Sequence, residues 1–224
     1  LILGGMPEVI KSWTATHDYR EPELVQQKIL ESCELDFNRD EPENDNLLPF
    51  WNSIPKQMAR ENGKFIYREV RPGAKARELE DTLRQLQSTG MVYKIIKLDK
   101  PCMPPSFYID PNCFKLYLFD TGLLRKMAGV PPGSIMTGPD IYDEFKGRLV
   151  ENFAMQELRF YLDSELYYWT GGNQAEVDFI IQNGDELLPL EVKSGTSVKS
   201  KSLRFYREKY HPRCGLRLSI LNLH

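Results

Sequence analysis

Apolar residues recur at the three- to four-residue spacing of a helix near the start of the chain. This pattern predicts that residues 6–37 are helical, with Pro22 near the start of a helix. Residues 38–46 form a polar, proline-containing stretch that predicts a loop. A further helix is expected from about Pro55 to Glu61.

A second amphipathic helix is predicted where Leu79, Leu83 and Leu86 line one face and Gly90 provides the stop. The apolar run directly after the stop is typical of a strand. Short helices, a helix ending in glycine and a returning strand form the order of a winged helix. The second helix of a basic winged helix can enter the major groove of DNA, and residues 64–100 carry nine basic and five acidic residues. A module that only packs or docks a protein is the alternative.

The last part of the chain alternates between helical and strand patterns. We expect a helix from about Tyr142 to Leu162, a strand at 165–170 and a hairpin within 175–195. A helix at 198–210 and a strand at 215–223 follow. The final β-α-β step predicts a right-handed crossover to a parallel neighbour. The expected fold class is therefore α/β (α+β), with helices packed on a mixed sheet.

Residues 130–140 are rich in proline and glycine and form the best candidate for a linker. A chain of 224 residues has room for one large domain or two small ones. We expect a helical connecting region at 1–46, a winged-helix-like domain at 47–130 and an α/β domain at 140–224.

Composition and charge limit the class of protein. The formal net charge is −3 and 41% of the residues are hydrophobic, which is enough for a core. No apolar run approaches the roughly 20 residues that span a bilayer, and there is no secretory leader, so a cytoplasmic protein without membrane contact is expected. The chain begins with Leu1, from which we expect that an upstream part belongs to the full protein.

Two further features concern partners and metals. From Glu191 onward the chain carries eight Lys or Arg and two Glu, so one face can bind a polyanion although a solvated surface explains the same charges. The four cysteines show no CxxC pair and no shared spacing with histidine, which disfavours a zinc site. Structural, reduced thiols are the better interpretation.

The hairpin "AEVDFIIQNGDELLPLEVKSG" (175–195) carries charged residues inside its apolar runs. Side chains on a strand alternate between its two faces, so the side chain of Asp178 points away from the face of its apolar neighbours. The side chain of Glu191 does the same on the second strand. A loop formed by Gly184 and Asp185 places the two carboxylates directly opposite one another. A loop one residue earlier makes them diagonal neighbours. Either register puts both on one face, within roughly 8 Å.

Two carboxylates held this close repel one another, and Mg²⁺ removes that penalty because it prefers oxygen ligands. The sequence therefore predicts Asp178 and Glu191 as metal ligands. Lys193, two residues further along the strand, can hold a phosphate or stabilise a nucleophilic water. Metal-assisted phosphodiester hydrolysis needs these parts. The alternative is a buried polar cluster with a salt bridge from Lys193 to a carboxylate.

The stretches "VDFII" and "LPLEVKSG" resemble the D…ExK signature of the PD-(D/E)XK nuclease superfamily, whose core has the order αβββαβ. In that superfamily a glutamate of the first helix often completes the site. The resemblance therefore assigns catalytic roles to Glu151, Asp178, Glu191 and Lys193, with Glu157 as the second choice for the helix position. Gln174 is a further candidate on the face of Asp178.

The stretches "GGMPEVI", "QQKILESCELDF", "FKLYLFDTGLL", "GRLVENFAMQEL" and "YYWTGGNQAEVDFII", with the segment from "FWNSIPKQ" to "GMVYKI", resemble a group of prokaryotic AAA-type ATPases. These carry an N-terminal P-loop domain and a C-terminal domain of unknown function. The chain has no GxxxxGK[ST] motif, so it looks like the C-terminal portion alone, and ATP binding is implied only for the missing upstream domain.

Two functions follow as expectations. The first is an accessory domain that binds DNA or a partner protein and works with its own N-terminal ATPase domain. The second is an active, Mg²⁺-dependent phosphodiesterase or nuclease acting on DNA. The basic helix with Lys199, Lys201, Arg204, Arg207 and Lys209 favours nucleic acid near the carboxylates. Nearby aromatic residues can stack on bases, although core packing explains most of them. A homo-oligomer is left open.

Overall fold

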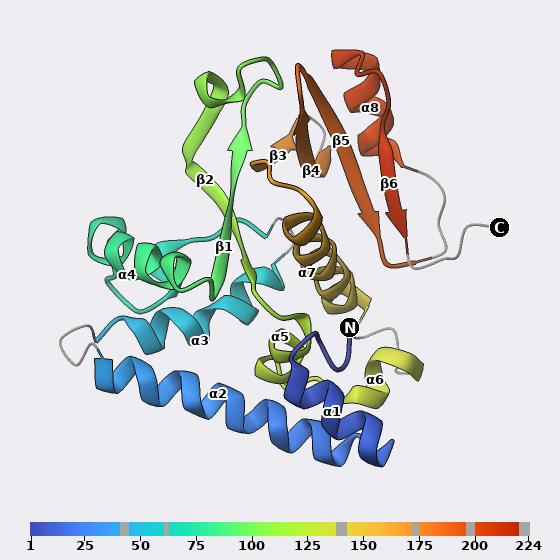
Figure 1. The fold of residues 1–224 in the computed structure, drawn as a ribbon. Helices are drawn as coiled ribbons and strands as arrows, with labels where there is room; N and C mark the ends of the chain where they lie inside the picture. The colour runs from blue at the N-terminus through green and yellow to red at the C-terminus, as the bar shows by residue number, and fades with distance from the viewer. Residues whose placement is uncertain (41–44, 61–62, 138–142, 172–174, 196–199, 220–224) are drawn as a thin grey trace. The chain divides into compact units, whose positions relative to one another are not determined.

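The computed structural model describes residues 1–40, 45–60, 63–137, 143–171, 175–195 and 200–219 (Figure 1). The chain forms two compact units. Unit 1 contains residues 1–93 and 116–153, and unit 2 contains residues 94–115 and 154–224. None of the helices in the described part of the chain combines the length and the apolar character that a bilayer crossing requires.

Unit 1 is mainly helical. Its helices within the described residues are α1 (Pro7–Thr16), α2 (Arg20–Asp40), α3 (Leu47–Met58), the 3-10 helix η1 (Tyr67–Glu69), α4 (Ala76–Ser88), α5 (Thr121–Met127), α6 (Pro132–Thr137) and the first part of α7 (Asp143–Tyr161).

The helical pattern at 6–37 corresponds to two helices, α1 and α2, because the chain turns between them. His17 has a φ of 49°, in the left-handed region, and its backbone N–H donates to the Trp13 carbonyl at 2.8 Å. The carboxylate of Asp18 then accepts the backbone N–H of Arg20 at 3.0 Å, at the start of α2. Local polar contacts therefore divide the helical stretch.

The helix expected from about Pro55 to Glu61 begins earlier and ends earlier, so this prediction was wrong. Helix α3 runs from Leu47 to Met58, with Pro55 inside it. An interior proline costs about 3 kcal/mol. The buried side chains of α3 include Leu47, Phe50, Trp51, Ile54 and Met58, and burying each contributes roughly 1.5–3 kcal/mol. Core packing therefore outweighs the proline.

The predicted helix and strand that follow are confirmed. Helix α4 ends at Ser88, and Gly90 after it has a φ of 72°, a conformation that glycine adopts without steric cost. Strand β1 (Val92–Leu98) comes next, and β2 (Ile109–Leu118) returns beside it. The amide of Phe119 donates to the Met91 carbonyl at 3.1 Å, in unit 1.

Arg125 organises a buried polar network in unit 1 and is 1% exposed. Its guanidinium donates to the carbonyls of Ile2 (3.2 Å) and Val130, to the Gln26 side chain (2.7 Å), and to the Glu23 carboxylate. The amide of Gln26 also donates to the Ile2 carbonyl at 3.1 Å. The network thereby fixes the first residues of the chain against α2 and α5.

Asp120 adds a second anchor for the same segment. Its carboxylate accepts the backbone N–H groups of Gly5 at 2.6 Å and of Leu123 at 2.8 Å. A Cβ atom on Gly4 would lie 2.1 Å from a carboxylate oxygen of Asp120, and Gly4 has a φ of +76°. Gly4 is therefore required both by its backbone conformation and by the close approach of Asp120.

Unit 2 contains most of the sheet. Its elements are parts of β1, β2 and α7, with η2 (Pro105–Tyr108), β3 (Leu166–Thr170), β4 (Glu176–Asn183), β5 (Glu186–Lys193), α8 (Lys201–Tyr210) and β6 (Leu216–Ser219). The strand order is β2-β1-β3-β4-β5-β6. Strands β1 and β3 pair in parallel, β3–β4 and β4–β5 pair antiparallel, and β5–β6 pair in parallel. The expected α/β class, the mixed sheet and the parallel last strand are confirmed.

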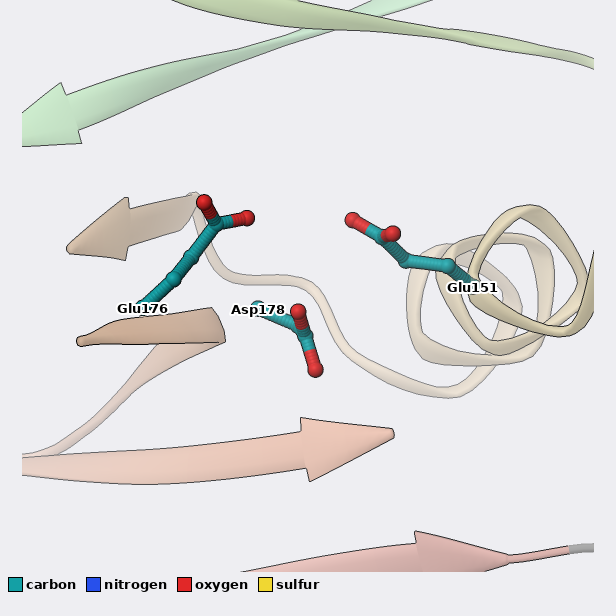
Figure 2. A group of neighbouring side chains, drawn as sticks. All are labelled: Glu151, Glu176 and Asp178. Carbon is teal, nitrogen blue, oxygen red and sulfur yellow. The ribbon is translucent and has the colours of Figure 1, made fainter. Parts of the chain in front are cut away.

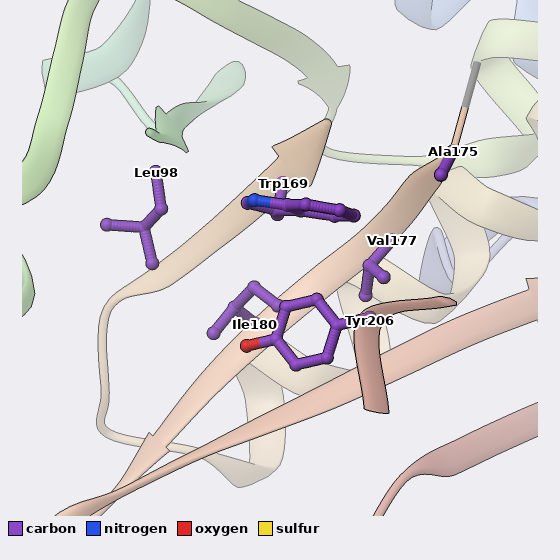
Figure 3. Close-up of a cluster of buried hydrophobic side chains, with 6 residues drawn as sticks. All are labelled: Leu98, Trp169, Ala175, Val177, Ile180 and Tyr206. Atoms are coloured by element: carbon purple, nitrogen blue, oxygen red, sulfur yellow. The ribbon is translucent and has the colours of Figure 1, made fainter. Parts of the chain in front are cut away.

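One hydrophobic cluster holds α8 on the sheet (Figure 3). Trp169 of β3 and Tyr206 of α8 are each 1% exposed, and their rings meet edge to face with centroids 5.2 Å apart. Val177 and Ile180 of β4 complete the contact between strand and helix. These aromatic rings therefore serve core packing, as the sequence favoured over stacking on bases.

Candidate functional site

The hairpin adopts the first of the two registers that the sequence left open. Phe179 pairs with Leu190, and Asn183 pairs with Glu186, so Gly184 and Asp185 form the loop. Gly184 has a φ of 61°, which suits glycine at the first position of a tight hairpin turn. The paired residues of β4 and β5 end at Phe179 and Leu190, which are adjacent in sequence to Asp178 on one strand and to Glu191 on the other.

Strand β4 departs from strict alternation beside Asp178. Val177 pairs with Trp169, whereas Ile180 pairs with Tyr167, so three steps along β4 match two steps along β3. Val177 and Ile180 consequently join the same hydrophobic cluster. The prediction that alternation continues unbroken along β4 was therefore wrong, because an extra residue forms a bulge. Bulges of this kind re-aim side chains and are frequent next to active sites.

Two carboxylates project from β4 beside this bulge. Glu176 and Asp178 each offer one carboxylate oxygen, and these oxygens lie within 4.8 Å of each other (Figure 2). Both residues are half-buried. The Oδ2 atom of Asp178 accepts the backbone N–H of Val192 on β5 at 2.7 Å, which fixes the side chain toward the neighbouring strand.

Glu176 has a buried cationic partner from a distant part of the chain. The Nζ atom of Lys115, on β2, donates to Oε1 of Glu176. Lys115 is 2% exposed, and its Nζ atom lies 5.3 Å from the centre of the Tyr168 ring. Burial raises the pKa of Tyr168, so its phenol stays protonated. The ion pair of Lys115 and Glu176 thus lies beside an aromatic ring in unit 2.

Glu191 is the most enclosed acid of the hairpin, at 3% exposure. One carboxylate oxygen lies 2.6 Å from Nζ of Lys193, and the other accepts the hydroxyl of Ser200. Ser200 also caps α8, because its side chain accepts the Leu203 N–H at 3.3 Å. Both oxygens of Glu191 therefore already have protein partners, one of them the predicted Lys193.

Glu151 lies on α7, in unit 1, three residues before the point where α7 enters unit 2. Figure 2 draws it together with the two β4 carboxylates. It is 5% exposed, accepts the Tyr117 hydroxyl and forms an ion pair with Arg148 at 2.9 Å. The second choice for this helix position, Glu157, is exposed. Gln174 lies outside the described residues.

The structure therefore distributes the predicted residues over two environments within the hairpin. Asp178 faces Glu176, whereas Glu191 bonds to Lys193 and Ser200. Glu176 was not among the site residues predicted from the sequence. The available signal was its position two residues before Asp178 on the same strand.

The exposed side of α8 is basic. Lys201, Arg204, Arg207 and Lys209 are exposed, and so are Arg213 and Arg217 after the helix. Glu208 is the only acidic residue of α8, and it lies 3.8 Å from Arg204. The predicted basic residue Lys199 lies outside the described residues. Positive charge thus follows the exposed side of α8 and continues toward β6.

The carboxylate pair suits a hard divalent cation in its chemistry. Carboxylate oxygens are the ligands that Mg²⁺ prefers, and Glu176 with Asp178 supplies two of them at neighbouring positions. Lys115 supplies positive charge at the same place and already neutralises one of these acids. The arrangement can therefore accept a cation, but only in competition with an internal ammonium group.

Comparison with known protein families gives two matches. A family model described as Domain of unknown function (DUF8612) matches residues 1–134. A second, described as Domain of unknown function (DUF4143), matches residues 146–221, and this domain is often found in proteins associated with AAA-type ATPases. Comparison with curated proteins and with solved structures finds no match.

Proposed function

We propose that this chain, which belongs to the family described as Domain of unknown function (DUF8612), is an accessory portion of an AAA-type ATPase that binds DNA through unit 2. The observation that carries the proposal is the exposed basic side of α8. Lysine and arginine side chains on one helix face neutralise phosphates and release condensed counterions, which favours binding to any DNA sequence.

The ATPase part of the proposal is supported by the DUF4143 match over residues 146–221. This chain has no GxxxxGK[ST] motif, so ATP would bind only to an upstream domain of the full-length protein. That domain is the proposed intramolecular partner, and a cytoplasmic location is part of the same proposal.

The acid-containing hairpin supports a nuclease-like framework that works as a binding module. The described elements from α7 onward follow the order helix, three strands, helix, strand, which is the order of the PD-(D/E)XK core. Within it, Glu176 and Glu191 are each paired with a lysine of unit 2. These two acids are neutralised internally and need no metal to offset their charge, which favours the binding function.

Binding to DNA is tested by fluorescence anisotropy with a labelled duplex over a series of salt concentrations. We expect saturable binding whose log K falls linearly with log salt, with a slope of about −3 to −4 for four phosphate contacts. Affinity that does not change with salt, or no binding at low salt, contradicts the proposal. In that case a protein partner becomes the better candidate for the basic surface.

A second function, Mg²⁺-dependent phosphodiester hydrolysis, is favoured by the proximity of the Glu176 and Asp178 oxygens. Bound Mg²⁺ would stabilise charge on a phosphoryl group and lower the pKa of a water. Asp178 would hold the ion with Glu176, and Glu191 would join after releasing Lys193 or Ser200. Lys193 would then be free to approach a phosphate. Glu151 of α7 is the third acid that the resemblance to the PD-(D/E)XK core implies.

Calorimetric titration with Mg²⁺ or Mn²⁺ tests this second function. We expect wild-type protein to bind with a millimolar or lower Kd, and Asp178→Ala/Glu191→Ala to lose binding. Asp178→Asn/Glu176→Gln isolates the pair on β4, and Asp185→Asn, at the exposed hairpin turn, is the matched control. Unchanged binding in both double variants would show that the ion binds elsewhere. Cleavage of labelled DNA is then measured with the same variants.

A further inference from the structure

Unit 1 contains a cavity of about 340 Å³ that takes no part in the proposed DNA-binding surface. Its walls come from five segments of the chain: the C-terminal half of α2, the start of α3, the end of α4, the residue before β1 and the residue after β2. A concave pocket of this size that is mostly apolar is the usual form of a small-molecule site.

The interior of the cavity is apolar. Leu47 and Leu86 are each 1% exposed, and Phe37, Met91 and Phe119 are half-buried around the opening. The ring of Phe37 is held from behind by Trp51, with centroids 5.7 Å apart and the rings edge to face. Several apolar side chains are therefore held in position by the core and are partly exposed to solvent in one cavity.

Cys33 lines the cavity as a neutral group. Burial, and secondly the negative charge of Asp36, raise the pKa of the Cys33 thiol. The thiol is therefore protonated at neutral pH and adds to the apolar wall.

The polar groups at the cavity favour positive charge. Asp36 contributes a carboxylate. It forms an ion pair at 3.1 Å with Arg39, whose side chain is 74% exposed. Gln85, Leu86 and Thr89 belong to the C-terminal end of α4, where the helix dipole is negative. The last turn of α4 contains no basic residue that would compensate it. Both features add negative potential at this opening, where a ligand cation would share Asp36 with Arg39.

We propose that this cavity binds a small organic cation with an aromatic or branched apolar body and one protonated amine. The apolar body would occupy the space between Phe37, Leu86 and Phe119. The amine would lie at the opening, between the Asp36 carboxylate and the last turn of α4. Such a site would make unit 1 a ligand-responsive part of the protein, separate from the basic surface of unit 2.

Two probes of equal size test this proposal: 2-phenylethylamine, which is charged, and 2-phenylethanol, which is neutral. Titrations of the full chain are followed by the amide resonances of residues around the cavity in heteronuclear NMR spectra. We expect saturable shifts at Cys33, Gln85 and Thr89, with a Kd on the order of millimolar for the amine. No saturable shift at these residues with either probe overturns the proposal.

Two pairs of variants separate the apolar and the electrostatic parts. Asp36→Asn should weaken binding of the amine by about fivefold and leave binding of the alcohol unchanged. Asp81 is an exposed acid of α4 outside the cavity, so Asp81→Asn should change the affinity for neither probe. Thr89→Phe fills the exposed rim of the cavity and should abolish binding of both probes. Ser88→Phe, at the neighbouring position outside the cavity, should leave their binding unchanged. Equal effects of Asp36→Asn on both probes, or binding that survives Thr89→Phe, overturn the proposal.

Discussion

Replacing the four basic residues of α8 lowers DNA affinity by about a hundredfold or more at 0.1 M salt and flattens the salt dependence by about 3 to 4 units of slope. Each phosphate contact contributes roughly 0.9 to the slope, because one condensed counterion is released for each neutralised phosphate. Glutamine is the chosen substitute because its helix propensity is close to that of lysine and arginine. The residues are Lys201, Arg204, Arg207 and Lys209.

The control must change the net charge equally at another place. Replacing four exposed bases of unit 1 by glutamine does so, and suitable residues are Lys11, Lys28, Arg39 and Lys56. We expect this control to bind DNA with nearly wild-type affinity and slope. An equal loss in both variants would show that net charge alone governs binding. Circular dichroism checks the fold, since the Nζ atom of Lys209 lies 5.8 Å from the centre of the Trp169 ring.

Local signals in the sequence were sufficient to predict the hairpin. A strand has a period of two residues, and "NGD" restricts the loop to two registers, both of which keep Asp178 and Glu191 on one face. The observed loop of Gly184 and Asp185 is one of these two. The prediction depended only on residues close in sequence, which is why it could be made without knowledge of the rest of the fold.

The partners of the acids could not be predicted in the same way. Lys115 meets Glu176 across 61 positions of the chain, and its role depends on β1 and β2 joining the sheet beside β3. A lysine between apolar neighbours in a sequence gives no indication of which acid it will meet. Ser200 likewise reaches Glu191 only because α8 begins there. Such pairings are properties of the tertiary structure.

The errors in the predicted elements have the same origin. The helix predicted from about Pro55 begins at Leu47 instead, because the core side chains of α3 hold Pro55 in the helix interior. The bulge in β4 depends on pairing with β3, which the sequence of β4 alone does not reveal. Local propensity therefore predicted the type of element correctly and failed where packing against a distant element decided the boundary or the register.

Replacing Arg125 by methionine lowers the free energy of unfolding of unit 1 by about 3–5 kcal/mol, because removing one partner of a buried charged network leaves the others unpaired. Arg125 is 1% exposed, and its guanidinium is shared among the Glu23 carboxylate, the Gln26 side chain and two backbone carbonyls. Methionine fills a similar volume, so the loss reports mainly on polar partners rather than on a cavity.

Native-state hydrogen exchange measures this loss separately for each unit. We expect reduced protection of the Gly5 amide, which donates to Asp120, and little change for amides of β4 and β5 in unit 2. Lys126→Met is the matched control: Lys126 contacts the same Glu23 at 3.2 Å but its side chain is 22% exposed, so its replacement should cost less than about 1 kcal/mol. If the two variants lose equal protection, the buried network does not hold the first residues of the chain, and their attachment to unit 1 has to come from apolar contacts instead.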